Sequence, residues 1–122
     1  MILVDTSVWI DHFRSHDEAL ANLLNDNRVL MHPYVLGELA CGNLANRGEL
    51  LRLLGALPQA TVATDSEARF FIAQHALMGK GIGYIDIHLL ASVALEDTSE
   101  LWTRDKRLHD VAKALSCAWD EQ

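Results

Sequence analysis

The feature that most constrains the fold is a short apolar run at the start of the chain, Ile2-Leu3-Val4, which ends abruptly in Asp5. An unbroken apolar run between polar residues predicts a strand buried on both faces, as in a parallel sheet covered by helices. Thr6 or Ser7 can act as the N-cap of a helix that begins at once. The pattern therefore predicts a carboxylate at the C-terminal end of a central parallel strand, which is where open α/β sheets bind ligands.

Short apolar runs alternate with helical patterns along the rest of the chain. Helix starts are indicated by an S-x-x-E capping box at Ser15–Glu18, by a T-x-x-E box at Thr64–Glu67, and by Pro33, which suits the first position of a helix. Strands that alternate with helices form parallel sheets with right-handed crossovers. We therefore expect one α/β domain over residues 1–122, with further strands at residues 29–31, 61–63 and 101–103 and an edge strand at 117–119.

The bulk composition is that of an ordinary globular protein, with 50% hydrophobic and 22% charged residues in a chain of 122. Cys41 and Cys117 lie far apart and form no C-x-x-C pair, which favours buried thiols in a reducing compartment over a disulfide. The chain begins directly in a predicted strand, so we expect no signal peptide. No apolar stretch reaches the roughly 18 residues that a membrane span needs. These features predict a cytoplasmic protein that does not enter a membrane.

The formal net charge of −7 has the wrong sign for a protein that binds nucleic acid over its whole surface. Nucleic acid remains compatible with this charge if metal ions occupy an acidic cleft and basic residues line its rim. The sign of the charge also fits a basic protein partner.

Four carboxylates stand where the predicted elements begin or end. Asp5 and Asp105 follow strands, Asp86 precedes a strongly apolar helix, and Glu38 lies in an early helix. Each has an ordinary interpretation, Glu38 as part of a solvated helix face and the later two aspartates as helix N-caps. Several acids at one sheet edge repel one another, however, and such a cluster indicates a bound cation. Because hard divalent ions prefer oxygen ligands, the four acids indicate a Mg²⁺ site able to support phosphodiester hydrolysis.

The residues around these acids form an ordered set of short motifs. The motifs are V-D-T-S at Val4–Ser7, the early Glu38, G-I-G-Y-I-D at Gly81–Asp86 leading into Leu89–Ala91, and W-T-R-D at Trp102–Asp105. In this order they resemble PIN-domain proteins, and most of all the VapC type, the toxin half of VapBC toxin–antitoxin pairs. The resemblance spans nearly the whole chain. It implies a three-layer α/β/α PIN-like fold with a short central parallel sheet.

The resemblance also implies an activity, a cofactor and partners. It implies a Mg²⁺- or Mn²⁺-dependent endoribonuclease that cuts single-stranded or loop RNA with one or two metal ions. It further implies a homodimer and a basic-tailed antitoxin that plugs the site. The residues carried over are the acids of the metal site, Asp5, Glu38, Asp86 and Asp105, and the supporting hydroxyls of Thr6, Ser7 and Thr103.

Several basic residues flank the acidic motifs and are candidates for contacts with RNA phosphates, although each fits a solvated surface charge equally well. They are Arg14, Lys80, Arg104, Lys106 and Arg107. Core packing explains Trp9, which is close to Asp5, better than stacking on a base does.

Two other functions fit a chain of this length and class. A phospho-acceptor receiver-like signalling domain needs an acidic pair after its first strand, a central aspartate and a late lysine. Here Asp5 is followed by Thr6, the run at residues 61–63 ends without an aspartate directly at its tip, and no lysine follows Trp119. A non-catalytic PIN-like module that binds RNA or protein would be expected to have lost one of the four acids. All four acids are present, so the nuclease is the preferred hypothesis.

Overall fold

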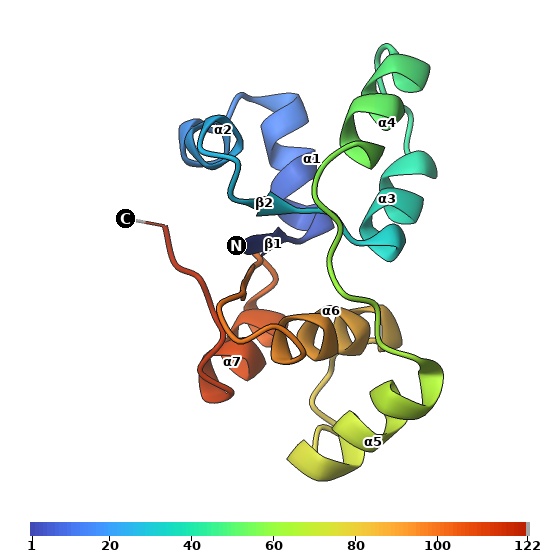
Figure 1. The fold of residues 1–122 in the computed structure, drawn as a ribbon, viewed down its shortest axis with the longest axis vertical. Helices are drawn as coiled ribbons and strands as arrows, with labels where there is room; N and C mark the ends of the chain where they lie inside the picture. Colours follow the sequence, from blue (N-terminus) through green and yellow to red (C-terminus); the bar gives the residue numbers. More distant parts are fainter. Residues whose placement is uncertain (122) are drawn as a thin grey trace.

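A three-stranded parallel sheet lies at the centre of the protein. The computed structural model describes residues 1–121, and Figure 1 shows the strands between two groups of helices. The strand order is β2-β1-β3, in which β1 (Ile2–Val4) lies between β2 (Val29–Leu30) and β3 (Glu100–Trp102). Both neighbours pair with β1 in parallel. The first apolar run is therefore the central strand of a parallel sheet, as predicted.

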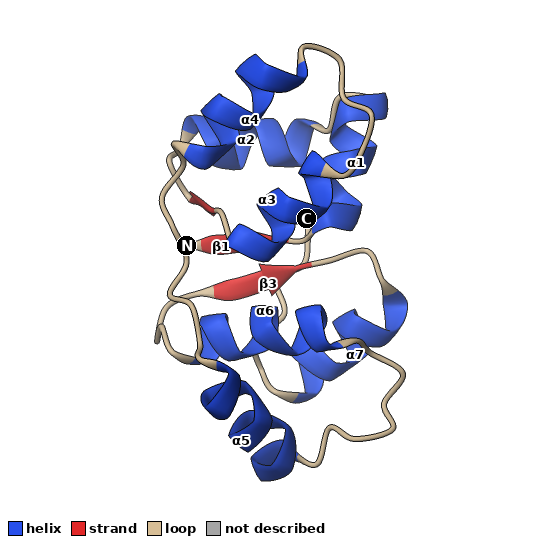
Figure 2. Cartoon of the chain, turned by 90° about the vertical axis from the view of Figure 1, so that its right-hand side faces the viewer, coloured by secondary structure: helices blue, strands red, loops and turns tan. Residues whose placement is uncertain are grey.

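Helices cover both faces of this sheet, as Figure 2 shows most clearly. The helices on one side are α1 (Thr6–Arg14), α2 (Glu18–Asn25), α3 (Pro33–Ala40) and α4 (Arg47–Gly55). Those on the other side are α5 (Asp65–His75), α6 (Tyr84–Ala94) and α7 (Lys106–Ala114). This arrangement confirms the three-layer α/β/α fold with a short central parallel sheet.

The most apolar segments are buried because they lie in the middle of this stack. Every residue of β1 is at most 1% exposed. Seven consecutive residues of α6, Ile87–Val93, are buried because this helix packs against both β3 and α5. A helix that is apolar all round is expected in such a position. Trp9 of α1 and Trp102 of β3 are also buried, so Trp9 belongs to the core as predicted.

The strand predicted at residues 61–63 is wrong. Backbone pairing beside β2 is limited to one parallel bridge between Met31 and Gln59. Two residues later the Thr61 N–H donates to the Glu96 carboxylate at 2.9 Å. That carboxylate takes the donor that a strand would offer to the sheet, so this weakly apolar segment connects irregularly to α5.

The edge strand predicted at residues 117–119 is reduced to one bridge, between Leu101 and Ala118. The Leu101 N–H donates to the Cys117 carbonyl at 2.8 Å, and the Trp119 N–H donates to the Leu101 carbonyl at 2.9 Å. The rings of Trp119 and Trp102 lie 4.6 Å apart between centroids. This short pairing and the aromatic contact hold the C-terminal segment against β3.

Two expectations from composition concern thiols and membranes. Cys41 and Cys117 are free thiols, as expected, but Cys41 is exposed because it lies at the C-terminal cap of α3. Among the helices of residues 1–121, none combines the length and the apolar character that crossing a membrane requires.

Two of the predicted helix starts are confirmed. The Thr64–Glu67 capping box forms in both directions, since the Thr64 N–H donates to Glu67 Oε1 at 2.8 Å and the Glu67 N–H donates to Thr64 Oγ1 at 3.1 Å. Pro33 is the first residue of α3. Both positions match the local rules for helix N-termini.

The capping box predicted at Ser15 is wrong. The N-cap of α2 is Asp17, whose Oδ1 accepts the Leu20 N–H at 3.0 Å. Ser15 instead ends α1, and its N–H donates to the Asp11 carbonyl. A carboxylate at the cap position also interacts favourably with the positive end of the helix dipole, so Asp17 is the stronger cap.

Replacing Asp17 by Ala should lower the free energy of unfolding by about 1 kcal/mol or more, because the cap hydrogen bond is lost. Ser15→Ala is the matched control and should change it by less than about 0.5 kcal/mol. Asp17→Asn keeps an oxygen for the Leu20 N–H, so it isolates the loss of the ion pair between Asp17 and Arg104. Urea unfolding followed by circular dichroism measures all three values. Equal losses for Asp17→Ala and Ser15→Ala would contradict this cap assignment.

Candidate active site

The C-terminal ends of β1 and β3 lie side by side and bring two acidic motifs together. Val4 is opposite Trp102 in the strand register, and the Asp5 N–H donates to the Trp102 carbonyl at 2.9 Å. The chain turns into α1 directly after β1 and into α7 soon after β3. The segments Asp5–Ser7 and Thr103–Asp105 therefore meet at one edge of the sheet, as the sequence predicts.

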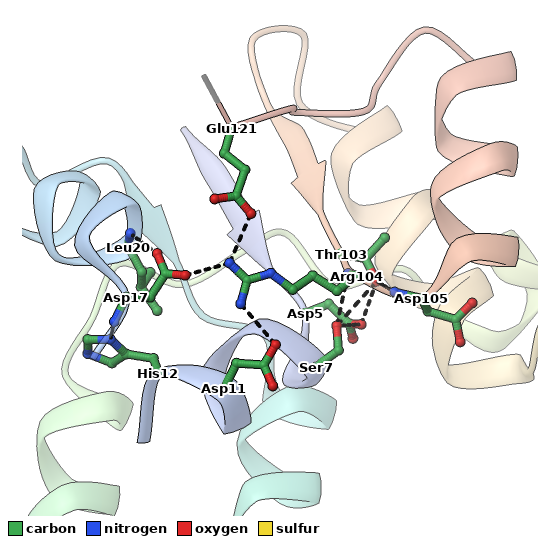
Figure 3. A network of polar contacts seen from close by, with 10 residues as sticks. All are labelled: Asp5, Ser7, Asp11, His12, Asp17, Leu20, Thr103, Arg104, Asp105 and Glu121. Atoms are coloured by element: carbon green, nitrogen blue, oxygen red, sulfur yellow. Dashed lines mark hydrogen bonds and ion pairs between the residues drawn. The ribbon is translucent and has the colours of Figure 1, made fainter. Parts of the chain in front are cut away.

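Asp5 is held by two hydroxyl groups and is only 7% exposed. Its Oδ2 accepts hydrogen bonds from the Thr103 hydroxyl at 2.7 Å and from the Ser7 hydroxyl at 2.8 Å. Those hydroxyl oxygens in turn accept from the backbone, Thr103 from the Asp105 N–H and Ser7 from the Arg104 N–H, each at 3.1 Å. The direction of the Asp5 carboxylate is thus fixed from both strand ends (Figure 3).

Thr6 and Ser7 do not cap α1 as predicted, because they are its first two residues. Asp5 occupies the N-cap position, but its side chain makes no cap hydrogen bond. The hydroxyls of Thr6 and Ser7 bind acids instead, and the Thr6 hydroxyl donates to Glu38 Oε1 at 2.7 Å. The Thr6–Glu38 bond crosses from α1 to α3, which is the placement that a supporting role at the site would require.

Asp86 is not the N-cap of α6, contrary to its ordinary interpretation. The helix begins two residues earlier at Tyr84, with Gly83 at the cap position. Asp86 Oδ2 accepts the Gly83 N–H at 3.2 Å. Because glycine has no side chain with which to cap, the acid in the first turn bonds back to it, where the helix dipole favours negative charge.

Asp105 does serve as the N-cap of α7. Its Oδ1 accepts the Leu108 N–H at 3.0 Å, which confirms the ordinary interpretation of this residue. Capping occupies only one of the two carboxylate oxygens. The cap therefore orients Asp105 without excluding a second role for it.

The four acids share one electrostatic neighbourhood. Burial raises the pKa of Asp86, and the negative charges of Asp5, Asp105 and Glu38 raise it further, against the opposing effect of the Gly83 N–H. Within residues 1–121, each acid has one oxygen in a hydrogen bond and a second oxygen in none. The arrangement is a set of oriented carboxylates, each with one oxygen available to a ligand.

Oxygen donors of this kind suit Mg²⁺ or Mn²⁺, but they do not form a closed cage. Within residues 1–121, no group of three or more His, Cys, Asp or Glu side chains lies close enough together to hold a metal ion. The charges of the four acids nevertheless influence one another, because electrostatic effects extend well beyond the length of a metal–ligand bond. Mg²⁺ keeps several waters and commonly takes only one or two protein carboxylates directly. The donor set therefore fits a hydrated ion held by few protein ligands.

Arg104 does not face the four acids. Its guanidinium donates to the carboxylates of Asp11, Asp17 and Glu121. Figure 3 shows the side chain extending away from the Asp105 carboxylate. These bonds, above all the one to Asp17, hold the pKa of Arg104 above its usual value. Arg104 therefore ties together α1, the start of α2 and the C-terminal segment, and its charge is already compensated.

Two further features lie beside the acids, and the sequence did not predict their contacts. His88, two residues after Asp86, is buried between the rings of Tyr34 and Tyr84, at centroid distances of 4.9 Å and 4.7 Å. The other is the Gly83 N–H, which fixes Asp86. The G-x-x-D spacing from Gly83 to Asp86 is present in the sequence, but only the position at which α6 begins reveals the bond.

Comparisons with known proteins identify a matching family and similar proteins. A family model described as PIN domain matches residues 2–114. The chain is 48% identical over 108 residues to "Ribonuclease VapC32" of Mycobacterium tuberculosis, in strains CDC 1551 / Oshkosh and ATCC 25618 / H37Rv, and the match covers 88% of this chain and 87% of the relative. A solved structure described as "Structure of FitAB bound to IR36 DNA fragment" has a TM-score of 0.58 and 20% identity, over 93% of this chain and 91% of that one. At that identity the similarity concerns the fold alone.

Replacing Asp86 by Asn should raise the melting temperature at about pH 7 in EDTA, because like-charge repulsion is relieved while an oxygen remains for the Gly83 N–H. The folded-state pKa of Asp86 is raised above 3.8. Asp86 therefore holds its proton more tightly in the native state than in the unfolded state. Its contribution to stability falls as the pH rises through this pKa. The gain from Asp86→Asn should accordingly be larger at about pH 7 than at about pH 4.

Scanning calorimetry at both pH values measures this gain. Asp97→Asn is the control, because Asp97 is an exposed acid outside the four. A melting temperature for Asp86→Asn equal to that of the wild type at both pH values would rule out repulsion at this position.

Proposed function

The chain belongs to the PIN-domain family, and we propose that it is a metal-dependent endoribonuclease, the toxin component of a type II toxin–antitoxin pair. The observation that carries this proposal is the set of four oriented carboxylates at the C-terminal edge of a parallel sheet. Within residues 1–121, one oxygen of each makes no hydrogen bond. The name ribonuclease, given to the relative that is 48% identical, supports RNA as the substrate.

Asp5 and Asp86 are the best candidates to contact Mg²⁺ or Mn²⁺ directly. Asp5 is buried and Asp86 is partly buried, whereas Glu38 and Asp105 are exposed. The two exposed acids would hold a second ion or the waters of the first. When bound, the ion supplies positive charge at the scissile phosphate and lowers the pKa of the attacking water.

The supporting groups of the chain keep these acids aimed before a substrate arrives. The hydroxyls of Ser7 and Thr103 orient Asp5, and the hydroxyl of Thr6 orients Glu38. Because folding already fixes these directions, little reorganisation is needed at the moment of reaction. Without a cation, the combined negative charge would repel an RNA phosphate. The same four acids that repel RNA alone would therefore admit it with the metal.

The two alternative functions have less support. A receiver-like domain would carry its phospho-acceptor after a central strand, but residues 61–63 are not part of the sheet, and Asp5 is followed by Thr6 in place of a second acid. A non-catalytic binding module has no need of four oriented acids. Their hydrogen bonds favour the catalytic hypothesis.

The charge of the chain favours a basic protein partner. The net charge is −7, and the four acids concentrate negative charge at one edge. An arginine or lysine of a cognate antitoxin would be attracted to this edge in place of the metal. The family resemblance implies the same partner and also a homodimer, and both belong to this proposal.

Replacing Asp5 by Asn should reduce cleavage of single-stranded RNA at least about a hundredfold, because a candidate metal ligand loses its charge. Asn keeps an oxygen for the Ser7 and Thr103 hydroxyls, so the circular dichroism spectrum should stay that of the wild type. Glu49→Gln is the control, because Glu49 is an exposed acid paired with Arg52 on α4. Gel assays of labelled RNA with Mg²⁺, Mn²⁺ or excess EDTA measure the activity. Full activity in EDTA would refute the metal-dependent mechanism.

An arginine-rich peptide should bind the chain with strong salt dependence, because opposite charges attract across the acidic edge. We expect the affinity to fall at least about tenfold between roughly 0.05 M and 0.5 M salt. Calorimetric titration of wild type and Asp86→Asn measures this, with a glutamine-substituted peptide as control. Affinity that does not change with salt, or that is equal for both peptides, would count against a basic partner at this site.

A further inference from the structure

Two basic side chains lie on the segments next to the acidic turns. Arg107 is the second residue of α7, two positions after Asp105, and Lys80 is in the loop that leads to Asp86. Within residues 1–121, neither Lys80 nor Arg107 has an ion-pair partner. Both side chains belong to exposed residues. Their charges are therefore available to an anion beside the acids.

Two other cations close to the acidic turns, Arg104 and Lys106, are already paired. Arg104 binds three carboxylates, and Lys106 pairs with Asp110 at 3.2 Å. A polyanionic strand that approaches the acidic edge needs a cation that these internal pairs have not compensated. Arg107 and Lys80 meet that requirement on the α7 side of the edge.

The position of Arg107 depends on Gly81. A Cβ atom at Gly81 would lie 2.9 Å from both Cδ and Nη1 of Arg107, so the arginine lies directly across the bare glycine backbone. Gly81 also has a φ of +78°, a conformation that residues with side chains rarely adopt. The contact joins the loop before Asp86 to the first turn of α7 after Asp105.

A groove of about 440 Å³ runs between this loop and α7. Lys80 and Arg107 border it, and apolar side chains such as Leu77, Val111 and Leu115 line it together with Asp110. Asp110 is already compensated by Lys106. The groove thus combines an apolar lining with two unpaired cations, a surface suited to a sugar–phosphate backbone.

We propose that Lys80 and Arg107 form a binding site for the backbone phosphates of single-stranded RNA on the α7 side of the four acids, with Gly81 as the positioning residue for Arg107. This inference rests on the proposed function. The phosphates next to the scissile one would lie against Arg107 and Lys80, and the acids with their metal would take the scissile phosphate. The contacts are to backbone charge, so they hold the strand without selecting its sequence.

The test measures binding of a fluorescein-labelled single-stranded RNA oligonucleotide by anisotropy over a range of salt concentrations. It uses an Asp5→Asn background, in which cleavage is expected to be at least about a hundredfold slower than in the wild type. Arg107→Gln and Lys80→Gln should each weaken binding by roughly three- to tenfold and reduce the slope of log affinity against log salt by about 0.7. Lys113→Gln is the matched control, because Lys113 is also exposed and unpaired within residues 1–121 but lies in the last turn of α7. It should change neither quantity.

Gly81→Ala tests the positioning role. It should weaken binding about as much as Arg107→Gln does, and the double variant should bind no worse than Arg107→Gln alone. A purely structural effect of Gly81→Ala would instead add to the loss from Arg107→Gln. If Gly81→Ala does not fold, the two glutamine variants and Lys113→Gln still decide whether the site exists.

The outcomes separate this inference from the proposed function. If the parent binds RNA and the wild type cleaves it, but both glutamine variants keep the parental affinity and salt slope, Lys80 and Arg107 do not contact the backbone. In that case the contact between Arg107 and Gly81 only holds the loop before Asp86 against the first turn of α7. If the parent does not bind RNA and the wild type does not cleave it, the proposed function is wrong and the phosphate site is wrong with it.

Discussion

The hydrogen bond from the Thr103 hydroxyl to Asp5 is the contact on which the acidic edge depends. It is 2.7 Å long, it is buried, and it connects the ends of the two neighbouring strands β1 and β3. Leaving a buried carboxylate oxygen without its donors costs about 1–3 kcal/mol or more, so the fold strongly favours a closed arrangement. Because the same hydroxyl accepts the Asp105 N–H, the position of α7 follows from the bond that holds Asp5. The Thr103 hydroxyl thus connects the buried Asp5 to Asp105, the acid that caps α7.

Two groups of acids in this protein differ in what surrounds their negative charge. Asp11, Asp17 and Glu121 surround Arg104, which compensates part of their charge and fastens three segments together. The four acids at the sheet edge have no cation within residues 1–121 and are held by hydroxyls and backbone N–H groups instead. Such donors fix the direction of a carboxylate without cancelling its charge. The fold therefore tolerates repulsion at this edge, and the burial of β1 and α6 supplies the stability that offsets it.

Local patterns in the sequence predicted much of this fold. The apolar run before Asp5, the capping box at Thr64 and Pro33 at a helix start all depend on neighbours within a few residues, and all three are confirmed. The strand predicted at residues 61–63 does not form, because the carboxylate of the distant Glu96 accepts the backbone N–H of Thr61.

For the four acids as well, the local sequence predicts where each acid lies, whereas the residues that bind it come from distant parts of the chain. Strand order brings Asp5 and Asp105 to one edge, and this could be foreseen from two apolar runs that each end near an acid. The bond from Thr6 to Glu38 joins residues 32 positions apart, and the partners of Arg104 lie up to 93 positions away. No local pattern encodes such pairs. The family resemblance named the hydroxyls of Thr6, Ser7 and Thr103 as supports, but which acid each one binds could not be foreseen. The direct roles of the four acids stay a prediction.

The Thr103–Asp5 bond also has a consequence for the synthesis of the protein, because its two residues are 98 positions apart. The ribosome delivers the chain from its N-terminus, and contacts of such high sequence separation form only once both partners have emerged. Until the segment beyond β3 is available, Asp5 has neither the Thr103 donor nor Asp105 beside it. A nascent chain therefore carries three of the four acids but no assembled edge. For a nuclease made next to messenger RNA, this delay would keep the unfinished protein harmless to the transcript being translated.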